Sequence, residues 1–190
     1  MPRNPPGQNS LGETADATPA SLATEAGRLW TWSVAHYQKP GVSDLLISFQ
    51  DAHNLNVNLI LWCHWTATFR GAVETKILRE AFAVSNQWAE QVVRPLRNVR
   101  RKLKTPSARL NAQRVEALRQ MIKQSELDAE AIEQQALEQV AGPIDSHHPP
   151  PTDKILSCAK QNLEAYISLA NPSNKPTPKA LVDLVQKILL

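Results

Sequence analysis

Apolar residues recur every three or four positions over most of this 190-residue chain, and this spacing is the feature that most constrains its fold. Such spacing gathers apolar side chains on one face of an α-helix, whereas a half-buried strand would alternate apolar and polar residues. No segment alternates convincingly, so the sequence predicts an all-α fold: a single bundle-like domain of about seven to eight helices. A chain of this length can bury roughly 70% of its unfolded surface in one core.

Three proline-rich segments interrupt the helical pattern. Residues 1–18 contain few large apolar residues and predict a disordered tail, because little burial would offset the entropy of ordering them. Residues 143–151 end in three prolines and predict a semi-rigid connector, since proline cannot donate a backbone hydrogen bond. We therefore expect a helical domain over residues 19–142 and a C-terminal helical pair over residues 152–190 that packs on it. A third break, at 171–178, divides that pair.

Residues that favour helix ends set the bounds of the individual helices. The helix at 57–69 is apolar on most sides and should be the most buried. Pro95 should kink a long helix near Gln91, and Ser125 resembles the N-cap of a new helix with Leu127 and Ile132 facing inward. The predicted helices are 19–37, 42–53, 57–69, a long one between Gly71 and Leu103, 110–123, 125–141, 155–170 and 178–190.

The composition excludes several classes of protein. Six glycines, never closer than five positions apart, leave no glycine-rich phosphate-binding loop, and two cysteines exclude a disulfide framework or a cysteine-rich zinc site. The longest apolar stretch, residues 57–65, is shorter than the ~20 residues of a membrane span. The N-terminus has no apolar signal segment. We expect a cytoplasmic protein that does not enter a membrane.

Residues with metal-binding or catalytic chemistry do not fall into a known pattern. His53, Cys63 and His64 lie close in sequence, but Cys63 and His64 are adjacent and diverge by ~100° on a helix. The sequence contains neither H-E-x-x-H nor the Glu-x-x-His motif of di-iron bundles. Cys63 lies in an apolar helix, which should raise the pKa of its thiol. We expect no metal, no cofactor and no catalytic residue.

Charge is distributed unevenly along the chain. Residues 94–123 contain ten Lys and Arg against one acidic residue, whereas the flanking segments 1–93 and 124–190 carry net charges of −2 and −4. Such a cluster can neutralise phosphates, attract an acidic protein, or be covered by the acidic helix at 126–141. The cluster contains no aromatic residue that could stack on a nucleic-acid base. The candidate partner-binding residues are Arg94, Arg97, Arg100, Arg101 and Lys104.

A second candidate site is a polar patch beside apolar helix faces. Gln50, Asp51 and Asn58 either satisfy the helix ends at 53–57 or, with Trp62 and Trp65, line a ligand pocket to which Trp30 could contribute. Buried polar groups need partners, because an unpaired one costs ~1–3 kcal/mol. Tryptophans are more often core residues than ligand contacts.

A series of short motifs occurs here in the order and register of a known family. The chain resembles an uncharacterised family of short proteobacterial proteins, a domain of unknown function found in pseudomonads and vibrios, over about residues 25–140. It departs from the pattern at Asn54, where glycine is expected, and at Asn56, where aspartate is expected. The matching motifs are Leu29-Trp30, Tyr37, Pro40-Gly41-Val42, Gln50-Asp51, Val57-Asn58-Leu59, Leu61-Trp62-Cys63-x-Trp65, Trp88, Val92-Val93-Arg94-Pro95-Leu96-Arg97, Arg100-Arg101-x-Leu103-Lys104 and Glu126-Leu127-x-Ala129-Glu130.

The resemblance implies a helical bacterial protein and brings no activity with it. Three hypotheses follow from the sequence. The first is a non-enzymatic protein-interaction or regulatory module with an as yet unknown protein partner. The second is a nucleic-acid-binding protein that uses residues 94–123. The third is an enzyme or small-ligand binder at Gln50, Asp51 and Asn58, in which case Asp51→Asn would abolish activity rather than only lower stability.

Overall fold

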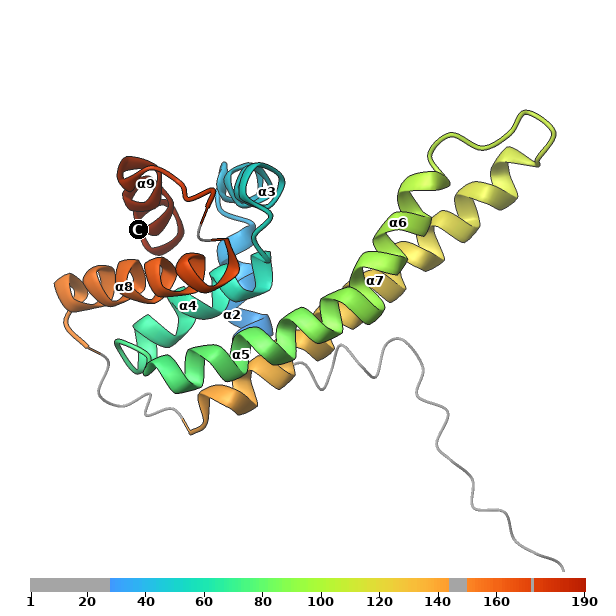
Figure 1. The fold of residues 1–190 in the computed structure, drawn as a ribbon. Coiled ribbons are helices and arrows are strands. Elements are labelled where there is room, and N and C mark those ends of the chain that lie inside the picture. Colours follow the sequence, from blue (N-terminus) through green and yellow to red (C-terminus); the bar gives the residue numbers. More distant parts are fainter. Residues whose placement is uncertain (1–27, 144–149, 172) are drawn as a thin grey trace, which may run out of the picture.

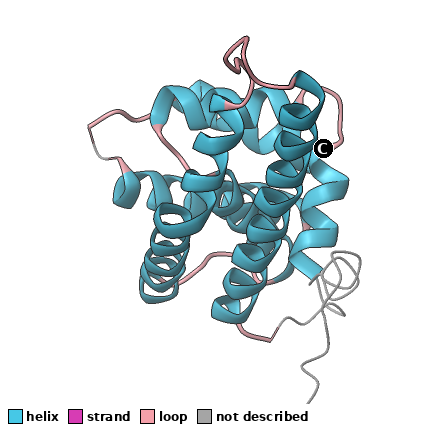
Figure 2. Cartoon of the chain, turned by 90° about the vertical axis from the view of Figure 1, so that its right-hand side faces the viewer, coloured by secondary structure: helices cyan, strands magenta, loops and turns pink. Residues whose placement is uncertain are grey.

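The computed structural model describes residues 28–143, 150–171 and 173–190, and every regular element in these ranges is helical (Figures 1 and 2). The all-α prediction is therefore confirmed. The predicted tail at 1–18 and most of the predicted connector at 143–151 lie outside the described residues. In chain order the elements are α2 (Arg28–Tyr37), α3 (Val42–His53), α4 (Val57–Phe69), α5 (Thr75–Trp88), a π-helical turn η1 (Ala89–Val93), α6 (Arg94–Lys102), α7 (Ala112–Ala141), α8 (Thr152–Ala170) and α9 (Pro178–Leu189).

Helix α4 is the centre of the core, as its apolar composition predicts. Ten consecutive residues from Asn58 to Ala67 are buried, and α4 packs against α2, α3, α5, α7, α8 and α9. Asn56 caps the helix, because its Oδ1 accepts a hydrogen bond of 2.8 Å from the Asn58 backbone N–H. Asn54, immediately after α3, adopts the left-handed conformation with φ 52°, which asparagine tolerates. These two residues set the turn that leads into α4.

The C-terminal helices share this core. Leu163 of α8 and Leu184 of α9 are fully buried in the same cluster as Leu59 of α4 and Leu137 of α7. In Figure 1, α8 lies across α4. A domain boundary at 143–151 stays a prediction. No helix within the described residues is long and apolar enough to cross a membrane.

The long helix that follows Gly71 changes its winding where Pro95 predicts a disturbance. Proline has no N–H, so the helical hydrogen bond to the Gln91 carbonyl is missing. The chain accommodates this with the π turn η1, in which the Arg94 backbone N–H bonds the Ala89 carbonyl five residues back. The expected kink near Gln91 takes the form of a widened turn, after which α6 continues the helix (Figure 1).

The predicted helix break at Ser125 is wrong. Helix α7 runs without interruption for 30 residues, and Ser125 donates its hydroxyl to the Met121 carbonyl (3.1 Å) instead of capping a new helix. The N-cap is Asn111, whose Oδ1 accepts from the Arg114 backbone N–H. Leu127 and Ile132, expected to face inward, are 38% and 41% exposed. Packing against α5 and α6 holds α7 continuous and decides which face is buried.

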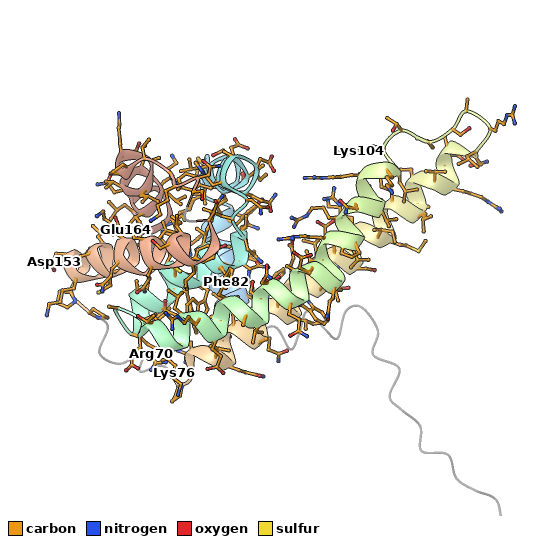
Figure 3. The ribbon with its side chains drawn as sticks, viewed as in Figure 1. Arg70, Lys76, Phe82, Lys104, Asp153 and Glu164 are labelled. Carbon is orange, nitrogen blue, oxygen red and sulfur yellow. The ribbon has the colours of Figure 1, made fainter. Side chains whose placement is uncertain are left out.

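Helix α6 and the first half of α7 extend away from the body as a two-helix hairpin (Figure 1). We call residues 98–125 the arm. Residues 103–111 connect its two helices, and Lys104 lies at the start of this loop, near the far end of the arm (Figure 3).

Candidate functional site: the root of the arm

Arg97 joins three helices where the arm meets the body. Its Nε donates to Glu126 Oε1 (2.8 Å), its Nη2 to Glu130 Oε1 (2.7 Å) and its Nη1 to Gln50 Oε1 (2.9 Å). These contacts link α6 to α7 and α3. Because the Arg97 side chain is only 22% exposed, the pairs are partly shielded from water.

The other candidate cations have different surroundings. Arg100 also pairs with Glu126, and Arg94 pairs with Glu90 one turn earlier in the same continuous helix. Arg101 and Lys104 are exposed and form no ion pair within the part of the chain that the structure describes. The acidic residues of α7 thus cover Arg97 and Arg100, where the basic segment meets the body, and leave Arg101 and Lys104 exposed.

A second polar cluster lies deeper, between α4, α5 and α7. Glu133 is 1% exposed and accepts hydrogen bonds from Asn56 Nδ2 (2.7 Å), Asn58 Nδ2 (2.9 Å) and Ser85 Oγ (2.6 Å). Gln134 Nε2 donates to Asn58 Oδ1 at 2.8 Å. Within the described residues, the direct hydrogen-bond partners of Glu133 are all neutral. These hydrogen bonds, together with the electrostatic attraction of Arg97, compensate part of the cost of burying this carboxyl group.

The polar patch singled out in the sequence does not form one pocket. Gln50 bonds Arg97, whereas Asp51 is exposed and, within the described part of the chain, its side chain accepts one hydrogen bond, from Gln50 Nε2 at 3.5 Å. Asn58 belongs to the Glu133 cluster. Trp62 donates its Nε1–H to the Leu137 carbonyl (2.8 Å), and Trp65 packs edge-on against Phe69 with ring centroids 5.9 Å apart.

Three glutamates that the sequence analysis did not select hold both clusters together. Glu126, Glu130 and Glu133 follow one another at spacings of four and three, which places them on one face of α7. The sequence signal that could have identified these glutamates is their position. They are charged residues on a helix face where a helix pair usually packs apolar side chains. That signal indicates buried partners without identifying them.

Burial and neighbouring charges shift the pKa values of these carboxyl groups. Burial raises the pKa of Glu130 to about 7; Arg97 opposes this shift, while the neighbouring Glu126 and Glu133 reinforce it. Burial also raises the pKa of Glu133, with partial opposition from its three hydrogen-bond donors. Burial acts on Glu126 in the same direction, but hydrogen bonds from Arg100 and Arg97 outweigh it and lower the pKa of Glu126.

The raised pKa of Glu130 predicts a pH dependence of stability. A group whose pKa is raised by folding contributes stability that is fully present below its unfolded pKa, near 4.5, and is lost as the pH rises through about 7. We expect the free energy of unfolding of the wild type, relative to Glu130→Gln, to rise by about 2 kcal/mol between pH 8 and pH 5. Urea unfolding at a series of pH values measures this difference.

Glu116→Gln is the control for that experiment. The pKa of Glu116 is lowered to about 2 by its hydrogen bonds to Arg119 and Gln120, so its titration lies below the window. A difference between wild type and Glu130→Gln that stays flat from pH 8 to pH 5 would contradict the shift assigned to Glu130.

Burial holds the thiol of Cys63 and the imidazole of His64 in unreactive states. Burial raises the pKa of the Cys63 thiol far above its ordinary value, which suppresses the thiolate. Burial lowers the pKa of His64 to about 4, and its Nδ1 bonds the Ile60 carbonyl at 2.7 Å. Within the described residues, no three His, Cys, Asp or Glu side chains are grouped so that they could hold a metal ion.

Comparison with known proteins places most of this chain in one family. A family model described as a protein of unknown function, DUF2390, matches residues 28–137, from the start of α2 to near the end of α7. The match contains the whole arm and both polar clusters at its root, whereas α8 and α9 lie beyond it. No curated protein and no solved structure matched the chain in the corresponding searches.

Proposed function

Since the chain belongs to the DUF2390 family, whose function is unknown, its surface has to indicate its role, and we propose that it is a protein-interaction module. The arm is the element that contacts the partner, and the partner is acidic. The helical body positions the arm.

The observation that carries this proposal is the lack of burial along the arm. None of the 28 residues from 98 to 125 is buried. Four of the ten exposed large hydrophobic residues in the described part of the chain lie there: Val99, Leu110, Leu118 and Met121. Exposed apolar side chains concentrated on a projecting element are typical of an interaction surface, because their transfer from water stabilises the complex.

Charge indicates the chemistry of the partner. The arm carries eight Lys and Arg residues and one acidic residue, Glu116, which pairs with Arg119. The cations of the arm that are exposed and form no ion pair within the described residues are Arg101, Lys102, Lys104, Arg109, Arg114 and Lys123. An acidic surface would be attracted to the arm and oriented on it.

One face of α7 combines both features. Leu118 and Met121 are three residues apart on the same side of the helix and are 43% and 61% exposed. Arg114 lies one turn before Leu118 on this face, whereas Lys123, two residues after Met121, lies on the opposite side of the helix. An apolar centre with a cation at one end fits a partner segment that presents apolar residues beside an Asp or Glu. The flexible thioether of Met121 can adapt to the partner surface.

The experiment compares two changes on the arm with two matched changes on the body. Leu118→Asp with Met121→Asp removes the apolar contact, and Arg101→Glu with Lys104→Glu reverses charge. Val182→Asp and Lys179→Glu make the same kinds of change at exposed positions of α9. Affinity purification from the native host with mass spectrometry should recover a protein with wild type and with both α9 variants, and recover at least ten-fold less with both arm variants.

Retention of every co-purifying protein by both arm variants would contradict the proposal. Circular dichroism of each variant checks that the helical body is intact. Because the mutated arm residues are exposed, thermal melting should change little.

Nucleic acid is the second candidate partner, and the six exposed cations of the arm are the observation that favours it. In that case affinity should fall steeply with salt, by about 0.9 log units per log unit of salt for each phosphate contacted. Arg101→Glu with Lys104→Glu should flatten this slope, and Leu118→Asp with Met121→Asp should weaken binding most at low salt, where the repulsion between the added carboxylates and the phosphates is screened least. Mobility-shift titrations with duplex DNA and RNA distinguish this partner from a protein.

A further inference from the structure

A hollow between α2 and α4 is lined mainly by rings. It has a volume of about 410 Å³ and shares no lining residue with the root of the arm. Volumes of this size are usual for small-molecule sites. The lining residues are Arg28, Thr31, Trp32, Ala35, His36, Trp65 and Phe69.

Two ring pairs form the walls. Trp32 and His36 stack with centroids 3.8 Å apart and planes at 21°, and Trp65 meets Phe69 edge-on. Each pair is held in place locally: His36 Nδ1 bonds the Trp32 carbonyl (2.7 Å), and Trp65 is 1% exposed. Rings held in position favour stacking or edge-on contact with another planar aromatic ring.

One permanently charged side chain lies at this hollow. Arg28 is exposed, and no ion pair occupies its guanidinium within the described residues. Among the described residues that line it, the only other titratable side chain is His36, whose pKa is lowered by burial and by Lys39 against the hydrogen bond to Trp32. At neutral pH the described lining therefore combines four neutral aromatic rings with a single cation.

We propose that this hollow binds a planar aromatic carboxylate, with the ring of the ligand among Trp32, Trp65 and Phe69 and its carboxylate on Arg28. The guanidinium of Arg28 can donate two parallel hydrogen bonds to a carboxylate. The site should therefore bind an anionic aromatic ligand more tightly than a neutral or cationic ligand of the same shape. The described lining contains no residue of the arm, so the test of this site does not depend on the proposed interaction function.

The test uses the full chain and three probes that share an indole ring. Indole-3-acetate is anionic, indole is neutral and tryptamine is cationic. Isothermal titration calorimetry should detect indole-3-acetate with an affinity at least about five-fold higher than that of indole, and tryptamine should bind most weakly. Equal affinities for the three probes, or no binding of indole-3-acetate at millimolar concentration, would overturn the proposal.

Two substitutions assign the binding to this hollow. Arg28→Gln should reduce the affinity for indole-3-acetate to that for indole, whereas Arg79→Gln, at an exposed position on α5, should leave it unchanged. Ala35→Phe should abolish binding, because the added ring fills the hollow. Ala35 is at an exposed helix position, so this substitution removes no core packing. Unchanged binding in Ala35→Phe would place the ligand elsewhere and refute the site, and circular dichroism confirms that this variant is folded.

Discussion

Replacing Arg97 with alanine should lower the free energy of unfolding by about 3–5 kcal/mol. The guanidinium is the shared partner of Glu126, Glu130 and Gln50, and the Glu126 side chain is only 7% exposed. Removing one member of a buried pair is costly, because the remaining carboxylates keep their desolvation penalty without the compensating charge. Urea unfolding at pH 7 measures the loss.

Arg101→Ala is the matched control, because Arg101 is on the same helix, is exposed and has no ion-pair partner within the described residues. Its effect should stay within about 0.5 kcal/mol. The cost of Arg97→Ala should also be smaller at pH 5 than at pH 8, since protonation of Glu130 relieves the unpaired charge. Equal effects of the two substitutions would show that the root of the arm does not depend on Arg97.

Glu133→Ala should cost about 2–4 kcal/mol. The substitution leaves the side-chain amides of Asn56 and Asn58 and the hydroxyl of Ser85 without their shared acceptor in the interior, and it also leaves a cavity. Chemical denaturation at pH 7 gives the change in free energy.

Asp51→Asn provides the comparison for that prediction, since it alters an exposed carboxylate that, among the described residues, is hydrogen-bonded only by Gln50. We expect its effect to be within about 0.5 kcal/mol. A Glu133→Ala protein as stable as Asp51→Asn would mean that the buried cluster contributes nothing to stability.

Local sequence signals account for the helices that are bounded by strong caps. The bounds predicted for α3 and α4, 42–53 and 57–69, are those observed, because Gly41, Asn54 and Asn56 each adopt or cap a conformation that few other residues favour. The π turn before Pro95 has an equally local cause. Such features depend on neighbours in sequence and can be predicted without knowing the fold.

The prediction failed at Ser125 because its local signal is ambiguous. A serine can cap a helix or bond the carbonyl one turn back, and which occurs depends on what packs beside it. The continuous contact of α7 with α5 and α6 selects the second arrangement. The same packing decides that Leu127 is exposed while Glu126 is buried.

The candidate sites also show which features local sequence predicts and which only the fold decides. Gln50 and Arg97 were selected from the sequence as members of separate groups, 47 residues apart, and the fold makes them direct partners. The extent of exposed charge on the arm could not be derived from composition either, since the neighbouring Arg100 and Arg101 are the same residue type, yet Arg100 is partly buried against Glu126 and Arg101 is exposed.

By itself, the amino-acid sequence determined the all-helical class, the family and the ends of the best-capped helices, because periodicity and capping act within a few residues. Only the tertiary structure decided which charges are neutralised, which tryptophans share a hollow and that a hairpin extends from the body. These properties depend on contacts between residues far apart in the chain, and burial and dielectric environment exist only once those contacts have formed.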